Sequence, residues 1–311
     1  MKHLARVLVA PALLLAVASC GGNSTSNAAE LDGVAVTFYP LRDFAERLLA
    51  DDVEVDCPLP PGEDPIFWQP DPAAIERFRS ARVVVSNGAE FEKWLASASL
   101  PESRHVRAAD GFSDRFLEFE HGVKHSHGPA GMHEHKGTDG HTWLDPKNAL
   151  IEVRAMETAF AKAFPEHADA IHARAGELAK DLADLDARWN ALVPELEKVH
   201  LLASHPAYQY VAQRYGLEVR NFDLDPDAML QPDQAHAVER AVTEATKPVV
   251  MLWESEPNAT LEKALRTELR VTSVEFSPAE NPDTPPEGGY VAIQRANLDR
   301  LEAAVAAALK R

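Results

Sequence analysis

The chain has 311 residues, of which 49 are acidic and 31 are Lys or Arg, and its formal net charge is −18 at pH 7. A chain this acidic repels nucleic acid and anionic lipid, which excludes nucleic-acid binding as its function. The length is sufficient for two lobes with separate hydrophobic cores.

The N-terminal segment has the pattern of a bacterial lipoprotein signal. A short basic head precedes an apolar run over 7–17, which is too short to span a membrane as a helix. The next residues, Val-Ala-Ser-Cys, resemble a lipobox, in which Cys20 becomes the lipidated first residue of the mature protein. The alternative is a signal peptide that contains a cysteine by chance. The low-complexity residues after Cys20 favour the lipobox, because an anchored protein needs a flexible tether. We therefore predict a signal peptide over 1–19, a tether over 20–32, and an exported protein anchored by lipid on the periplasmic or cell-surface side.

Between residues 33 and 164, short apolar runs alternate with amphipathic stretches. Strands that alternate with helices are typical of βαβ units around a parallel sheet, and we assign 33–164 to an N-terminal lobe. Cys57 is expected to be a small buried side chain rather than a metal ligand, and with Cys20 lipidated it has no partner for a disulfide. The predicted strands cover 34–40, 53–60 and 82–88, and the predicted helices cover 41–50, 72–80, 89–98 and the stretch after Pro146.

Residues 165–193 are predicted to form one long helix. Six apolar residues recur there at spacings of three, four and seven, which predicts a single apolar stripe on a helix about 42 Å long. A coiled-coil dimer is the alternative, but the stripe covers barely three heptads. We expect the helix to join two lobes of a monomer. The stripe consists of Ile171, Leu178, Leu182, Leu185, Trp189 and Leu192.

The alternation of strands and helices resumes after Pro194, and we assign 194–311 to a C-terminal lobe. The predicted fold class is α/β, with two lobes, each with a central, mainly parallel sheet flanked by helices, joined by one long helix. The predicted strands cover 199–204, 217–224, 248–254 and 270–276, and the predicted helices cover 206–215, 231–246, 258–268 and 289–310.

One histidine of the C-terminal lobe stands at a place where such folds bind ligands. Ligands of doubly wound lobes bind at the carboxyl ends of the strands. His205 directly follows the strand predicted at 199–204, and Pro206 opens the helix behind it. This placement indicates a histidine at a cleft; the alternative is a histidine that only decorates the start of the helix.

Five segments of the chain carry a family resemblance. They are PPGEDPIFWQPDP (60–72), VVVSNGAEFEKWL (83–95), GHTWLDP (140–146), HPAYQYVAQRYGL (205–217) and GGYVAIQRANLDRL (288–301). Together they resemble the zinc/manganese substrate-binding proteins of bacterial metal ABC transporters, the cluster A-I family. The segments occur in the family's order and span nearly all of the chain after the tether. The long helix resembles the rigid helix that joins the two lobes in this family.

The resemblance implies a binding protein and not an enzyme. Such a protein captures a divalent metal between its lobes and delivers it to the membrane permease of an ABC transporter. Family members use three histidines plus a carboxylate or water, and two of these positions are matched here, by His141 and His205. Neutral imidazole suits zinc, so that we expect Zn²⁺ rather than Mn²⁺. At two further ligand positions of the family this chain has Ile66 and Ser277 instead.

The sequence leaves open what completes the metal site. A nearby carboxylate could supply the missing ligand. The alternative for each candidate carboxylate is a solvated surface charge or a hydrogen-bond acceptor for a metal ligand. A histidine of the loop ahead of His141 could fold over instead. Alternatively, the cleft could hold a metal chelate, another metal or a different ligand in a more apolar pocket lined by Phe67, Trp68 and Trp143, residues that are also expected in ordinary packing. The candidate carboxylates are Glu63, Asp64, Glu254, Glu256 and Glu280.

The stretch from 121 to 141 contains six of the thirteen histidines. Five of them are interleaved with Gly, Lys and Pro, which predicts a flexible loop without rigid secondary structure. Such a loop binds metal weakly because ordering it costs entropy, but several imidazoles give it capacity. We interpret it as an auxiliary metal collector; the alternative is a polar loop without a metal role. The five histidines are His121, His125, His127, His133 and His135.

Two other functions compete with metal transport. A zinc hydrolase needs three protein ligands, an open water position and a base. The chain contains neither a His-Glu-x-x-His nor a Gly-x-Ser-x-Gly motif, which argues against a hydrolase. The remaining alternative is a lipid-anchored adhesin or a scavenger that binds metal through the His-rich loop without a transporter.

Overall fold

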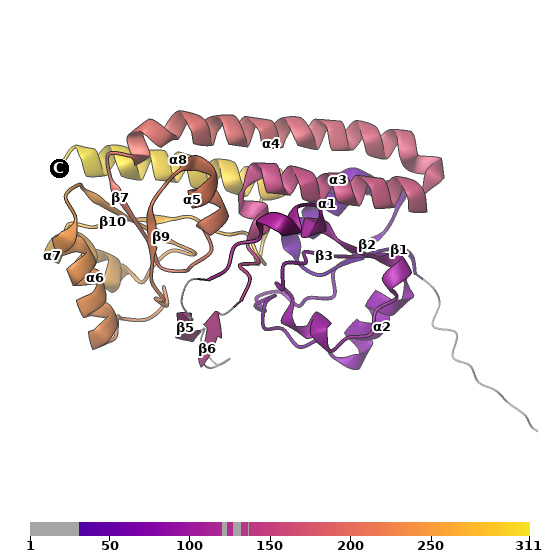
Figure 1. The fold of residues 1–311 in the computed structure, drawn as a ribbon, viewed down its shortest axis with the longest axis horizontal. Coiled ribbons are helices and arrows are strands. Elements are labelled where there is room, and N and C mark those ends of the chain that lie inside the picture. Colours follow the sequence, from indigo (N-terminus) through magenta and orange to yellow (C-terminus); the bar gives the residue numbers. More distant parts are fainter. Residues whose placement is uncertain (1–30, 120–122, 127–131, 136) are drawn as a thin grey trace, which may run out of the picture.

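The computed structural model describes residues 31–119, 123–126, 132–135 and 137–311. Two α/β lobes lie side by side in these residues, and one long helix, α4 (Ala168–Leu196), runs over both of them (Figure 1). The predicted fold class is therefore confirmed. None of the described helices is both long and apolar enough to cross a membrane.

Each lobe contains a four-stranded sheet in which all paired strands are parallel. The strand order is β2-β1-β3-β4 in the N-terminal lobe and β10-β9-β7-β8 in the C-terminal lobe. If β7 to β10 are numbered first to fourth and the second order is read from β8, both orders are 2-1-3-4. The two lobes therefore share one topology. The strands are β1 Leu31–Val36, β2 Val55–Asp56, β3 Ala81–Ser86, β4 His105–Arg107, β7 His200–Ala203, β8 Val219–Asn221, β9 Val249–Trp253 and β10 Thr272–Glu275.

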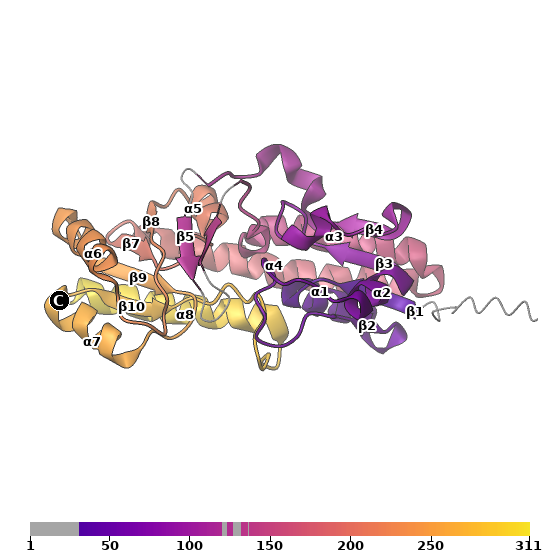
Figure 2. The same ribbon diagram turned by 90° about the horizontal axis from the view of Figure 1, so that it is seen from below.

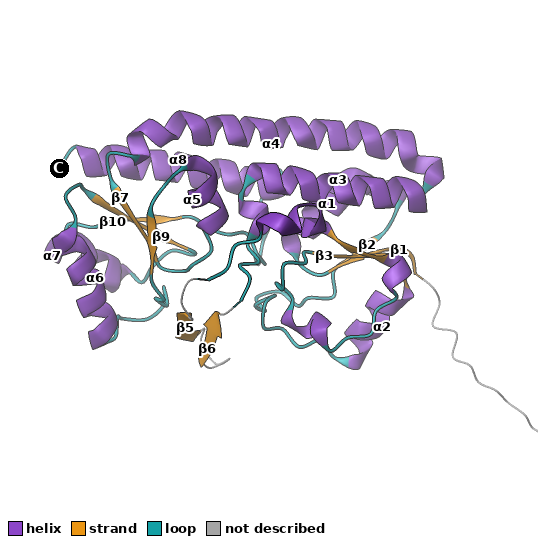
Figure 3. Ribbon diagram, viewed as in Figure 1, coloured by secondary structure: helices purple, strands orange, loops and turns teal. Residues whose placement is uncertain are grey.

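Helices lie on both faces of each sheet (Figure 3). On the side of α4, the helices α1 and α3 cover the N-terminal sheet and α8 covers the C-terminal sheet, while α2, α6 and α7 lie on the opposite side (Figure 1). The helices are α1 Tyr39–Leu49, α2 Pro72–Ser80, α3 Pro146–Ala163, α5 Gln209–Tyr215, α6 Pro232–Glu244, α7 Ala259–Glu268 and α8 Gly289–Leu309.

The apolar stripe of α4 is buried within the chain itself. All six residues of the predicted stripe are buried, and α4 packs against α1, α3 and α8. One hydrophobic core continues from the N-terminal lobe through α4 into the C-terminal lobe, so packing within one chain accounts for the stripe without a coiled-coil partner. The helix is 29 residues long and passes through Pro194, where we had predicted its end. Because proline lacks an N–H, Pro194 removes one main-chain hydrogen bond near the last turn of the helix.

The helix predicted over 89–98 is wrong. In its place the chain turns, with positive φ angles of 49° at Ala89 and 56° at Glu90, before a short 3₁₀ turn over Lys93–Ala96. The carboxylate of Glu92 points inward, where it accepts hydrogen bonds from the Thr37 hydroxyl and from the N–H of Asn87. The bond to Thr37, 55 residues away, and the bond within the turn hold this segment in a non-helical conformation.

The His-rich region contains regular structure that the sequence did not indicate. The strands β5 (Val123–Ser126) and β6 (Met132–His135) pair in an antiparallel hairpin, so the expectation of a loop without secondary structure is wrong for these residues. The hairpin lies between the two lobes, on the side away from α4 (Figures 1 and 2). Two smaller differences are the strand β4, which was not predicted, and β1, whose first two residues fall within the predicted tether.

Candidate metal centre

His141 is held by a tight turn in the N-terminal lobe, directly before the 3₁₀ turn η6 (Thr142–Leu144). The turn requires Gly140, because a Cβ atom at this position would lie 2.7 Å from the Cβ of Phe91. The side-chain amide of Asn87 donates a 2.8 Å hydrogen bond to the carbonyl of Gly140. Since His141 is only 1% exposed, its imidazole is shielded from solvent and fixed in place.

His205 approaches from the other lobe, at the carboxyl end of β7. The N–H of Ser204 donates to the carbonyl of Leu252 (2.9 Å). The hydrogen bonding between β7 and β9 therefore continues one residue past the end of β7. His205 follows, and it is 4% exposed. Its ring centroid lies 5.3 Å from that of His141, with the ring planes at 80°. The structure thus brings together the two histidines that the sequence singled out.

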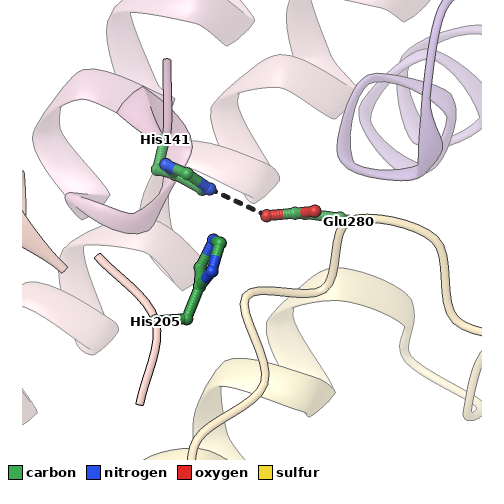
Figure 4. A group of neighbouring side chains, drawn as sticks. All are labelled: His141, His205 and Glu280. Atoms are coloured by element: carbon green, nitrogen blue, oxygen red, sulfur yellow. Dashed lines mark ion pairs between the residues drawn. The ribbon is translucent and has the colours of Figure 1, made fainter. Parts of the chain in front are cut away.

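Glu280 is the third member of the group (Figure 4). It lies in the loop between β10 and α8, and its Oε1 atom is 2.9 Å from Nε2 of His141. His141, His205 and Glu280 each offer one potential ligand atom, and these three atoms lie within 4.8 Å of one another. No other such group of three was found among the described residues. Of the five candidate carboxylates, the structure therefore selects Glu280 for this group.

The loop that carries Glu280 is tied to the N-terminal lobe. The indole N–H of Trp143 donates a 2.8 Å bond to the carbonyl of Pro278, and the main-chain N–H of Tyr39 donates to the carbonyl of Glu280. The side-chain amide of Asn281 donates to the carbonyls of Pro60 (2.8 Å) and Glu63 (2.9 Å). Although it belongs to the C-terminal part of the chain, Glu280 is thereby held against the N-terminal lobe.

Each histidine of the group has a carboxylate on its Nδ1 side. Oδ1 of Asp139 lies 2.7 Å from Nδ1 of His141, and Oε2 of Glu254 lies 3.7 Å from Nδ1 of His205. Burial lowers the pKa of His141, but the Asp139 and Glu280 carboxylates outweigh it and raise the pKa to about 10. Two imidazoles amid three carboxylates form a negative pocket that attracts a divalent cation, which must displace the proton of His141 when it binds.

The remaining candidate ligands lie outside the group. Ile66 is 5% exposed and belongs to the hydrophobic core, so it is a packing residue. The carboxylate of Asp64 accepts a 2.8 Å bond from the N–H of Ile66 and thereby holds the local turn. Glu63 and Glu256 are exposed, and the hydroxyl of Ser277 accepts a bond from the N–H of Ala279.

The aromatic candidates serve packing. Trp68 contacts Phe78 and Trp94, with ring centroids 6.4 and 5.9 Å away, and Trp143 contacts Phe38 at 4.7 Å. Both indoles are buried and belong to the hydrophobic core, which favours their interpretation as core residues over an apolar ligand pocket. Cys57 is a free cysteine, and burial raises the pKa of its thiol to about 11, so it is uncharged at neutral pH.

The auxiliary histidines are only partly within the described residues. In the hairpin, His125 pairs with His133 across the two strands, and His135 pairs with Val123. Their side-chain positions lie outside what the structure describes. His121, His127 and the predicted lipidation site Cys20 also lie outside the described residues.

The sequence analysis missed Asp139, which orients His141. Its Oδ1 accepts both the Nδ1 contact and a 2.9 Å bond from the main-chain N–H of His141. A carboxylate behind a metal-binding histidine fixes the tautomer and the direction of the ring, with Nε2 aimed at the ion. The signal that could have revealed it was the spacing Asp-Gly-His, since an acidic residue two positions before a histidine can fold back onto it.

Comparison with known proteins decides the family. Residues 34–304 match the family described as zinc-uptake complex component A, periplasmic (ZnuA). The chain belongs to this family. The match covers most of the sequence and confirms the resemblance carried by the five segments.

Individual members of the ZnuA family resemble the chain over most of its length. It is 28% identical to the high-affinity zinc uptake system protein ZnuA of Bacillus subtilis, over 97% of both chains. It is 25% identical to the zinc-binding lipoprotein AdcA of Streptococcus pneumoniae, over 97% of this chain but 61% of AdcA. The solved structure of the metal-dependent lipoprotein YcdH from Bacillus subtilis shares the fold, with a TM-score of 0.73 and 24% identity over 87% of this chain and 98% of YcdH.

Proposed function

We propose that this chain is the extracytoplasmic substrate-binding component of a zinc ABC transporter. It captures one zinc ion between its lobes and delivers the ion to the membrane permease. The observation that carries the proposal is the convergence of His141, His205 and Glu280 within 4.8 Å. The description of the ZnuA family as a component of zinc uptake supports zinc as the cargo, as do the names of two relatives.

The donor set suits zinc. Two imidazole nitrogens and one carboxylate oxygen are ligands that Zn²⁺ accepts at distances of about 2.0–2.2 Å. Around a tetrahedral ion with such bonds, ligand atoms lie about 3.4 Å apart. The described group, with atoms up to 4.8 Å apart, therefore needs to contract by about 1.4 Å. We expect small movements of these side chains to supply the contraction, without movement of the lobes.

Three protein ligands leave the fourth position of a tetrahedral ion for water or another small ligand. Ile66 stands where the family has a ligand, and it is packed into the core. This observation favours a second candidate function, in which the cargo is a zinc chelate or a different metal whose own ligand fills the open position. In both cases His141, His205 and Glu280 hold the ion.

A carrier fits the site better than a hydrolase. A catalytic zinc site also has three protein ligands, but it needs a free base beside the bound water. Here Glu280 acts as a ligand, while Asp139 and Glu254 face the Nδ1 atoms of the two histidines. No acidic residue of the group is thus left to serve as the base.

The export route and the His-rich region complete the proposal. We assign lipid anchoring to Cys20, which holds the monomeric protein on the outer side of the membrane near its permease. The histidines His121, His125, His127, His133 and His135 act as an auxiliary collector that raises the local concentration of zinc beside the cleft. The position of the hairpin between the lobes supports this role (Figure 1).

Zinc titration calorimetry tests the proposed function. The mature chain, with Cys20→Ser to prevent lipidation, is compared with the double variant His141→Ala/His205→Ala and with Glu280→Gln. We expect one tight site in the parent chain, its loss in the double variant, and weakened binding in Glu280→Gln. Weak binding by the hairpin histidines is expected to persist in all three.

Two matched variants serve as controls. Asp64→Asn and Glu256→Gln remove carboxylates that lie outside the group, and they are expected to bind zinc like the parent chain. If the double variant still binds one equivalent of zinc as tightly as the parent chain, the proposed site is wrong.

A further inference from the structure

The hairpin and the paired segments 117–119 and 137–139 form an arm, and the base of this arm reaches the metal centre. At the base, the N–H of Asp139 donates to the carbonyl of Leu117 (2.7 Å) and the N–H of Phe119 donates to that of Gly137 (3.0 Å). Glu118 and Thr138 pair between them in antiparallel fashion. The arm therefore ends at Asp139, the residue whose carboxylate orients His141.

A tyrosine of the other lobe closes the base of the arm. Tyr210 belongs to α5, which begins four residues after His205. Its hydroxyl accepts a 3.1 Å bond from the N–H of Leu117 and donates a 2.9 Å bond to the carbonyl of Asp139. One hydroxyl group thus bridges both strands of the arm.

The bridge is shielded from water. Tyr210 is 3% exposed and Asp139 is fully buried, so water cannot readily replace these bonds. Burial raises the pKa of the Tyr210 hydroxyl, which therefore keeps its proton and remains a donor. A buried main-chain N–H or carbonyl that loses its partner is costly, and the bridge is accordingly expected to persist.

Next to this bridge, a cavity of about 920 Å³ lies between the arm and the C-terminal lobe. It is lined by Leu117, Glu118 and Phe119 on the arm and by residues of β7, β8, α5 and α6 on the lobe. The Tyr210 hydroxyl therefore ties the base of the arm to the C-terminal lobe at the edge of this cavity.

We infer that Tyr210 is a positioning residue for metal binding: its hydroxyl fixes the base of the His-rich arm against the helix behind His205, and so sets Asp139 and His141 opposite His205. Tyr210 does not touch the ion. It acts through the main chain of Asp139, whose carboxylate in turn directs the His141 ring. The inference rests on the proposed function, because it concerns the same three-ligand site.

The test is Tyr210→Phe, which removes the hydroxyl and keeps the ring. Tyr215→Phe is the matched control, because Tyr215 lies on the same helix and its hydroxyl donates a 3.0 Å bond to Asp186, outside the metal group. Outer groups around metal sites contribute 10–100-fold to affinity. We expect zinc affinity to fall about 10-fold in Tyr210→Phe and less than two-fold in Tyr215→Phe.

A second readout separates positioning from general loss of stability. Co²⁺ replaces Zn²⁺ in the purified mature chain, and its visible absorption reports the geometry of the ligands. We expect an altered Co²⁺ spectrum in Tyr210→Phe but not in Tyr215→Phe, with similar melting temperatures for the two variants. Equal zinc affinities and equal Co²⁺ spectra for these variants would overturn the inference.

The His141→Ala/His205→Ala variant distinguishes the two possible failures. If it loses tight binding while Tyr210→Phe binds like the parent chain, the site stands and only the role of Tyr210 is wrong. If it keeps tight binding, the proposed function itself fails.

Discussion

Replacement of Asp139 tests how the metal centre is held. Its Oδ1 atom accepts two bonds from His141, at 2.7 Å from Nδ1 and 2.9 Å from the main-chain N–H. In Asp139→Asn the amide oxygen can still accept both bonds, so the ring direction is kept and only the negative charge is lost. In Asp139→Ala both the charge and the orienting bonds are lost. The two variants thus separate electrostatics from orientation.

The size of the effect follows from the geometry. A zinc ion on the far side of the His141 ring lies about 7 Å from the Asp139 oxygen, if its bond to Nε2 is about 2.1 Å. At an effective dielectric constant of about 20, the attraction between charges of −1 and +2 at that distance is about 5 kcal/mol, an upper bound before desolvation. Measured losses for such outer carboxylates are 10–100-fold, or about 1.4–2.8 kcal/mol. We assign about 10-fold to Asp139→Asn and about 100-fold to Asp139→Ala.

Competition with a zinc chelator measures these losses directly. Asp64→Asn is the control, because Asp64 also accepts a bond from a main-chain N–H but lies outside the group. The reasoning is refuted if Asp139→Asn binds zinc within two-fold of the parent chain. Equal losses in Asp139→Asn and Asp139→Ala would refute the separate contribution of orientation.

Three further predictions concern other parts of the site and the core. Ile66→His restores an imidazole at a family ligand position, and zinc affinity measured by calorimetry should rise at least 10-fold; an unchanged affinity would show that residue 66 does not face the ion. Asn281→Ala removes the bonds to Pro60 and Glu63 that hold the Glu280 loop, and should lower zinc affinity about 5-fold, but not in a chain that already carries Glu280→Gln. Burial raises the pKa of Glu152 to about 8, so the folded state binds its proton more tightly than the unfolded state does. Its stabilising effect is complete below about pH 4 and is lost as the pH rises through 8, by on the order of 5 kcal/mol. The melting temperature of the parent chain should therefore fall relative to Glu152→Gln between pH 5 and 9; parallel pH profiles would contradict this.

Elements that depend on local pattern were predictable from the sequence. The apolar stripe of α4 repeats over about six turns, and every predicted member of it is buried. His141 and His205 could be identified because each stands in a short motif at a defined place in the fold.

Features that depend on long-range contacts were not predictable. Glu280 could not be separated from Glu254 or Asp64, because its position depends on bonds from Trp143 and Tyr39, far away in the sequence. The helix predicted at 89–98 failed for the same reason, since the buried carboxylate of Glu92 bonds to Thr37, 55 residues away, instead of facing solvent. The hairpin was missed because its two four-residue strands, which contain histidines, lack the alternation of apolar and polar residues that marks a strand.

The most direct test of the metal centre is anomalous diffraction at the zinc absorption edge from crystals of the zinc-loaded mature chain. Our account predicts one strong peak between the lobes, about 2.0–2.2 Å from a nitrogen of His141, a nitrogen of His205 and an oxygen of Glu280. A strong peak at the hairpin histidines with none at this group would contradict it.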